Sequence, residues 1–198
     1  VLSGITIRSA ALDQQRQTQI QIQEKENSTR AEELVASLLK ANITQVPAVI
    51  SDLNEYRDWA DPLLKAGISE VEDGSAEKLQ LALALLPVDT TQVDYLYGRL
   101  LDAESHEVPV IRDALAPYKD ALLDKLWAVV EKPEKGKESQ RLRAASALGK
   151  YDPESDEWTK VQETVGNDLV AVPAVYLAMW MDSLRPVRMK LFPQLSAV

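Results

Sequence analysis

Few side chains in this sequence have the type and spacing that enzyme chemistry requires. Its 198 residues include one histidine, His106, which lies in a short polar stretch before Val108 and Pro109. A serine nucleophile needs a base and a group that orients the base, and one loop histidine does not supply both. We therefore expect His106 to be an exposed loop residue and no catalytic residue to be present.

Patterns for metals and cofactors are also missing. The sequence has no cysteine, which excludes disulfides, thiol nucleophiles and thiolate-bound metals. The acidic stretch 70–74 lacks the alternating aspartates of a calcium loop, and the seven glycines include no phosphate-binding run. With 31 acidic residues, neighbouring carboxylates are expected by chance and do not indicate acid–base chemistry. We expect no metal site and no cofactor.

The charge balance excludes one class of partner. The formal net charge is −9, whereas nucleic-acid binding draws its affinity from clustered Lys and Arg. We therefore expect no nucleic-acid partner. Arg185, Arg188 and Lys190 form a small basic exception. They are either a solvated helix face or a contact for an acidic segment.

The aromatic residues are the strongest candidates for recognition. Four Trp and six Tyr stand against one Phe, so nearly every ring carries a polar group suited to an interface. Most recur at equivalent positions of the internal repeat described below, which favours packing. Trp59, Tyr97 and Trp180 do not, and together with Arg185 and Arg188 they are our candidate binding residues.

The elements that would position these side chains are all helices. A polar, Gln-rich stretch free of Gly and Pro predicts a helix from about residue 9 to 40, with apolar spacing beginning at Leu34. Shorter helices are predicted at about 46–56, where Pro47 suits the first turn, at 76–86, and from Asp89 to about residue 103. Asp89 and Gln92 have the spacing of a capping box. Strand patterns are missing.

The sequence also repeats itself. Pro47, Leu53 and Tyr56 recur 62 residues later, and a second set recurs 63 residues later. A third copy begins near Val172, with an offset of 69. In the second set, the recurring residues are Leu79, Ala82, Ala84, Leu85, Asp89 and Tyr95, and their counterparts are Leu142, Ala145, Ala147, Leu148, Asp152 and Trp158. In the third set, the recurring residues are Asp113, Leu115, Pro117, Leu122 and Leu126, and their counterparts are Asp182, Leu184, Pro186, Leu191 and Leu195.

A unit of this length holds about two helix pairs. The prediction is an all-α fold, a HEAT/armadillo-like α-solenoid of stacked short helix pairs, because each pair needs its neighbour to complete its core. The helical-repeat domain would cover residues 31–198, with units at about 46–107 and 108–171 and a partial unit at 172–198. Residues 1–30 would form a tail and a Gln-rich stalk helix.

The stalk helix has little to bury in its first half. An isolated helix of this kind is marginally stable, so it either frays as a linker or packs on a partner, and a homodimer through residues 9–30 is one alternative. The apolar residues 1–7 are too short to span a bilayer. They are either a frayed helix start or the trailing end of a membrane helix that precedes them.

Four strings of the chain resemble one family. These strings are Val46-Pro47-Ala48-Val49-Ile50, residues 56–64 (YRDWADPLL), residues 81–89 (LALALLPVD) and residues 183–188 (SLRPVR). They are similar to the helical region of planctomycete transmembrane serine/threonine kinases, often with a sulfatase-modifying-factor-like domain at the C-terminal end. The resemblance covers about residues 31–198.

The resemblance implies an extracytoplasmic, soluble segment of a membrane-anchored parent, with residues 1–7 ending the membrane helix. The kinase loops are absent from this sequence, so kinase activity would belong to the parent, and no catalytic position carries over. We expect an interaction or sensing module that binds a protein or peptide. The alternative is a structural spacer or a dimerisation stalk that links the membrane to a downstream domain. A catalytic role would require that downstream domain to complete a composite site with this chain.

Overall fold

The structure is a computed structural model that describes the backbone of residues 2–192 and the side chains of residues 11–192. Within these residues the chain is built of helices and connections without a strand, which confirms the predicted all-α fold. The chain divides into two compact units, residues 1–73 and 74–198. This division lies inside the segment 46–107 that the repeat pattern groups together.

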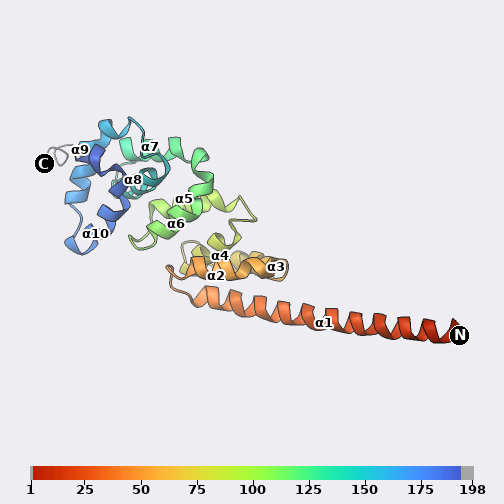
Figure 1. Cartoon of the computed structure of the whole chain (residues 1–198). Coiled ribbons are helices and arrows are strands. Elements are labelled where there is room, and N and C mark those ends of the chain that lie inside the picture. The colour runs from red at the N-terminus through yellow and green to blue at the C-terminus, as the bar shows by residue number, and fades with distance from the viewer. Residues whose placement is uncertain (1, 193–198) are drawn as a thin grey trace. The chain divides into compact units, whose positions relative to one another are not determined.

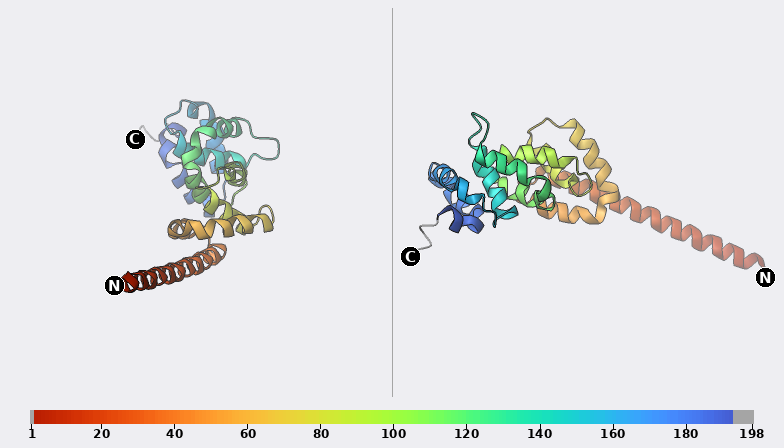
Figure 2. Two further views of the ribbon diagram at one scale, coloured as in Figure 1. Left: turned by 90° about the vertical axis from the view of Figure 1, so that its right-hand side faces the viewer. Right: turned by 90° about the horizontal axis from the view of Figure 1, so that it is seen from above.

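The first unit holds α1 (Leu2–Lys40), α2 (Val46–Leu53) and α3 (Arg57–Glu70), with a 3-10 turn at Asn54–Tyr56 between the last two. Helix α1 is one uninterrupted rod in every view, so the helix continues through residues 30 and 31 without a break (Figures 1 and 2). It contacts α2 and α3, and its residues Ala31, Leu34 and Leu38 are buried. Of the apolar positions predicted to face the core, Leu34 and Leu38 are buried, Val35 is half-buried and Leu39 is 37% exposed.

The rest of α1 has no buried face among the described side chains. Residues 11–26 are all exposed, and α1 extends well past α2 and α3 (Figure 1). The expectation that residues 1–7 end a membrane helix concerns side chains outside the described residues. In the described part of the chain, no helix is both long enough and apolar enough to cross a membrane.

The second unit contains the remaining helices. In chain order they are α4 (Ala76–Leu85), α5 (Gln92–Leu101), α6 (Val108–Leu115), α7 (Leu123–Glu131), α8 (Gln140–Tyr151), α9 (Trp158–Val170), α10 (Ala174–Ser183) and α11 (Arg188–Leu191), with 3-10 turns at Ala116–Ala121 and Arg185–Val187. Helix α8 is central, because it contacts α5, α6, α7, α9 and α10. Its small residues allow this: a Cβ added to Gly149 would lie 3.4 Å from the carbonyl oxygen of Ser183.

The order of elements recurs along the chain. A buried leucine lies at the end of one helix (Leu53 and Leu115) or directly after it (Leu184), and a 3-10 turn leads from it towards the next helix. The alanine pairs of the second repeat set also agree in burial, since Ala82, Ala84, Ala145 and Ala147 are all fully buried, whereas Tyr95 is half-buried and its counterpart Trp158 is fully buried. This recurrence is consistent with an all-α helical-repeat fold. Leu195, the last position of the predicted third copy, lies outside the described residues.

Local capping differs from the prediction at one helix. The capping box at Asp89 and Gln92 is wrong, because α5 begins at Gln92 itself and no side chain caps it. The Asp89 carboxylate instead accepts hydrogen bonds from the backbone N–H of Thr91 (3.0 Å) and from the side-chain Nε2 of Gln92 (2.8 Å). The carboxylate therefore fixes the turn that precedes the helix and leaves the first-turn amides to other partners.

Candidate ligand-binding pocket

The second unit contains an open pocket of about 370 Å³, which we call the α8–α10 pocket. Three parts of the chain form it: the connection before α6, the start of α8 with the residues just before it, and the end of α9 with the connection to α10 and α10 itself. The lining residues are Glu104, Ser105, Glu138, Ser139, Leu142, Arg143, Asp168, Ala171, Val172, Pro173, Tyr176 and Trp180. Its volume is in the range of known small-ligand and side-chain pockets.

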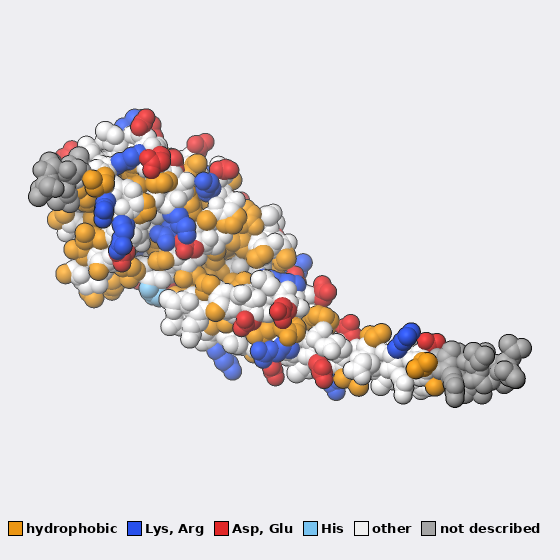
Figure 3. Space-filling view, viewed as in Figure 1, with side chains coloured by type: hydrophobic (Ala, Val, Ile, Leu, Met, Phe, Trp, Pro, Cys, Tyr) orange, Lys and Arg blue, Asp and Glu red, His pale blue; other side chains and the backbone are white. Residues whose placement is uncertain are grey.

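One wall of the α8–α10 pocket is apolar. Val172, Pro173, Tyr176 and Trp180 supply it from α10 and from the connection before α10. Tyr176 is 45% exposed, whereas Trp180 is only 6% exposed, so the tyrosine is open to solvent and the tryptophan forms the floor. Hydrophobic side chains gather over the region of α10 in the space-filling view (Figure 3). Further apolar residues of α10 and of the end of α9 are exposed, namely Val170, Val175 and Met181.

The opposite wall is polar and carries Arg143. Its Nε donates to the carbonyl oxygen of Ala103 (2.6 Å), and its Nη1 donates to the carbonyl oxygen of Ser139 (2.7 Å). Burial lowers the pKa of Arg143, and the nearby carboxylates of Asp102, Glu104 and Glu107 partly offset this effect. A guanidinium remains protonated in such a site, so Arg143 is a positive charge held mainly by neutral carbonyls.

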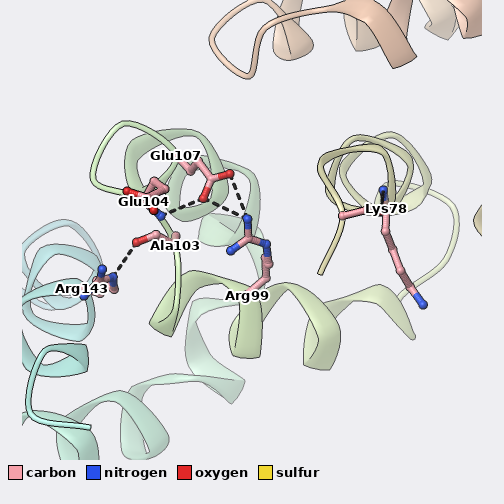
Figure 4. Close-up of polar contacts among 7 residues, drawn as sticks. Lys78, Arg99, Ala103, Glu104, Glu107 and Arg143 are labelled. Carbon is pink, nitrogen blue, oxygen red and sulfur yellow. Dashed lines mark hydrogen bonds and ion pairs between the residues drawn. The ribbon is translucent and has the colours of Figure 1, made fainter. Parts of the chain in front are cut away.

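A buried ion pair fixes the chain that carries Glu104. The Glu107 carboxylate is buried and accepts from Arg99 Nη2 at 3.0 and 3.1 Å, as well as from the backbone N–H of Glu104 at 2.8 Å. Figure 4 shows these donors converging on Glu107, with Arg143 reaching the neighbouring carbonyl of Ala103. Because the carboxylate bridges a side chain and the backbone, it holds the polar wall in one conformation.

The carboxylates of the pocket differ in their partners. Asp168 pairs with Arg141 at 2.7 Å. Glu138 is exposed and accepts from the backbone N–H of Gly136 at 3.0 Å, which lowers its pKa and keeps it ionised. Glu104 is exposed, and its carboxylate has no ion-pair partner among the described residues. Among the described residues, neither Glu104 nor Glu138 forms a direct ion pair, although Arg143 and Arg141 lie near enough to interact with their charges.

The predicted binding residues lie in different places. Trp59 belongs to the first unit, where it is half-buried and donates its indole N–H to Glu24 at 3.0 Å. Tyr97 lines a separate pocket of about 460 Å³ between α5 and α7. Its hydroxyl donates to the carbonyl oxygen of Lys125 at 3.4 Å. Burial raises the pKa of Tyr97, and the charge of Lys125 works against that rise.

Of the five candidates, Trp180 is the one that lines the α8–α10 pocket. Arg185 is exposed and pairs with Asp182 three residues before it. Arg188 is exposed at the first position of α11. Lys190 is half-buried, donates to the carbonyl oxygen of Ser155 at 3.2 Å and lies 3.8 Å from the Glu154 carboxylate. Arg185 and Arg188 thus match the solvated face, whereas Lys190 contacts an acidic segment of the same chain.

Sequence reasoning did not select Tyr176, Arg143, Glu104 or Glu138. A signal existed for one of them: Tyr176 and Trp180 are four residues apart in a helix, a spacing that puts both rings on one face. The other three come from connections and helix starts whose proximity only the folded chain reveals.

Comparison with known proteins finds no relative of this chain. No family model matches the chain, and neither the curated proteins nor the solved structures contain a match. The fold and the pocket therefore define this chain only as an all-α protein of packed helices with an open, mixed apolar and acidic pocket.

Proposed function

We propose that this chain is a HEAT-like helical-repeat module that binds a protein or peptide partner in the α8–α10 pocket. The observation that carries the proposal is the pairing of an apolar wall, with Tyr176 exposed and Trp180 buried, and a polar wall fixed by buried hydrogen bonds. Binding requires no reacting group. The chain's role would be interaction or sensing, with any chemistry performed elsewhere.

The scaffold suits this role physically. Aromatic residues in desolvated pockets contribute most of the binding energy at many protein interfaces, and a rigid scaffold reduces the entropy lost on binding. Trp180 and Tyr176 project from one helix, α10, which packs on the central helix α8. A ligand side chain would therefore meet a surface that is already formed.

The parent is the second part of the proposal. We propose, on the resemblance of the four strings quoted above, that the module belongs to the extracytoplasmic part of a receptor-like serine/threonine kinase. Phosphoryl transfer would then belong to a kinase domain elsewhere in the parent. The membrane would be reached through the parent's own transmembrane helix.

Peptide selection tests the binding proposal. The whole chain would be immobilised and used to select from a random peptide library, and the recovered peptides would be synthesised and measured by calorimetry. The variant Ala171→Trp fills the pocket from its rim and should weaken binding at least about tenfold, which corresponds to about 1.4 kcal/mol.

Ala178→Trp is the matched control, because Ala178 is also exposed near the pocket but does not line it. It should leave the affinity within about twofold. A selection that yields no peptide, or only peptides that bind Ala171→Trp as well as the unchanged chain, would count against this function and favour a spacer.

A second candidate function rests on the exposed part of α1. Leu12, Ile20 and Ile22 are 56%, 61% and 47% exposed, and their spacing puts them on one half of the helix surface. A single helix without a buried face is marginally stable in water, so a second copy covering this face would stabilise it. Helix α1 would then be a dimerisation stalk.

Sedimentation velocity on the whole chain tests the stalk. We expect a dimer, and we expect the variant Leu12→Gln/Ile20→Gln/Ile22→Gln to sediment as a monomer with unchanged helix content. Val170→Gln, at an even more exposed apolar site on α9 (81%), should leave the dimer intact. A monomer at micromolar concentration before any substitution would rule out the stalk.

A further inference from the structure

Trp180 differs from the other three tryptophans in its hydrogen bonding. Trp59 donates its indole N–H to Glu24 (3.0 Å), Trp127 to the Asp152 carboxylate (3.1 Å) and Trp158 to the Asp152 carbonyl oxygen (2.9 Å). Trp180 is 6% exposed, yet its indole N–H has no acceptor among the residues that the structure describes. The indole nitrogen itself is not among the fully enclosed polar atoms of the described residues, so solvent reaches it and it is available to an acceptor that enters the pocket.

We infer that the α8–α10 pocket binds an extended peptide segment through a basic side chain. In this arrangement a peptide carbonyl accepts the indole N–H of Trp180. The Lys or Arg side chain beside that carbonyl lies against the ring of Tyr176 and between the carboxylates of Glu104 and Glu138. This inference rests on the proposed binding function and names the chemistry of its ligand.

Charge favours a cation over an anion at this place. Asp168 is neutralised by Arg141, but Glu104 and Glu138 are exposed and unpaired by any cation among the described residues. Arg143 is the one opposing charge of the lining, and two of its N–H groups already donate to carbonyl oxygens. The chain as a whole carries −9, which attracts basic segments over longer distances.

The same chain already holds a lysine in this way. Lys125 Nζ lies 5.5 Å from the ring centre of Tyr97 and 3.1 Å from a carboxylate oxygen of Asp94. A cation is attracted to the face of an aromatic ring, and a carboxylate beside the ring adds a charge-assisted hydrogen bond. Tyr176, Glu104 and Glu138 bring the same kinds of group to the lining of the α8–α10 pocket, which contains no lysine.

NMR on the whole chain labelled with 15N-tryptophan tests the inference. The probe is a short alanine–glycine peptide, acetylated and amidated, with one central arginine. Its titration should shift the indole signal of Trp180 downfield and leave those of Trp59, Trp127 and Trp158 in place. Trp180→Phe assigns the signal by removing it. Counterparts with norleucine or glutamate in place of arginine should bind at least about tenfold more weakly.

Two double variants separate the pocket from general attraction. The variant Glu104→Gln/Glu138→Gln should weaken the affinity for the arginine peptide about tenfold. The control Glu26→Gln/Glu32→Gln makes the same change in net charge on α1 and should alter this affinity less than about twofold. Equal loss in both variants would mean unspecific attraction and overturn the inference.

Three other results would also overturn the inference. The first is a Trp180 indole signal that does not shift up to the solubility limit of the peptide. The second is a norleucine peptide that binds as tightly as the arginine peptide. The third is a glutamate peptide that binds more tightly than the arginine peptide, which would assign Arg143 as the anchor. None of these results decides the proposed function. A selected peptide without a basic residue could still bind in this pocket, and its binding would still be weakened by Ala171→Trp.

Discussion

Replacing Trp158 with alanine should lower the free energy of unfolding of the second unit by about 3–5 kcal/mol. Among the side chains that the structure describes, Trp158 is the largest that is fully buried, and it begins α9. Its ring meets Trp127 edge to face at a centroid distance of 5.0 Å, and Asp152 accepts from the indole N–H groups of both. The substitution removes a large buried volume, the ring contact and one donor at once.

Urea unfolding followed by near-UV circular dichroism would measure this loss. Trp158→Phe is the graded variant: it keeps an aromatic ring against Trp127 and loses the hydrogen bond, so its loss should be clearly smaller. Trp59→Ala, in the first unit, should leave the transition of the second unit unchanged. A loss below about 1 kcal/mol for Trp158→Ala would show that the site collapses around the missing ring and does not anchor the unit.

Trp158 also shows how far sequence reasoning reaches. Its position corresponds to Tyr95 in the repeat pattern, and recurrence at helical spacing predicted packing, which the complete burial of Trp158 confirms. Helix bounds follow the same local signals: the helix predicted at 76–86 is observed at Ala76–Leu85, with Ser75 capping its first turn through the backbone N–H of Lys78. The apolar periodicity of a helix and the residues that begin or end it lie within a few residues of each other, so a single sequence is enough to find them.

The α8–α10 pocket could not be found in this way. Glu104, Ser139 and Tyr176 come from three connections or helix ends far apart in sequence, and their proximity depends on how α8 packs between its neighbours. The state of each polar group depends on the fold as well. Trp59 and Trp180 are alike in sequence terms, but one donates its indole N–H to Glu24 and the other has no described acceptor.

The division between the units has a partly local cause. The first unit ends at Asp73, and Gly74 follows with a φ of 83°, in the left-handed region that glycine adopts without strain. The sequence marks residues 70–74 as an acidic loop, but such a loop occurs equally well inside a unit. The capping box at Asp89 fails for a similar reason, because the same two side chains can also stabilise a turn before the helix.

Replacing Glu107 with alanine should destabilise the second unit by about 3–5 kcal/mol, the range for breaking one partner of a buried pair. Arg99 and Glu107 keep only 18% and 11% of their side chains exposed, so the remaining guanidinium would be a buried charge without its counter-ion. The backbone N–H of Glu104 would lose its acceptor as well. Urea unfolding of the variant measures the loss.

The paired replacement Arg99→Met/Glu107→Leu separates charge from packing. Because it removes both charges and keeps apolar volume, it should recover most of the stability that Glu107→Ala loses. It should not recover peptide binding, since the backbone N–H of Glu104 still lacks the carboxylate that holds this stretch of the polar wall. Recovery of stability and arginine-peptide affinity together would mean that the Glu107 carboxylate stabilises the fold without positioning Glu104, and that the pocket forms independently of this ion pair.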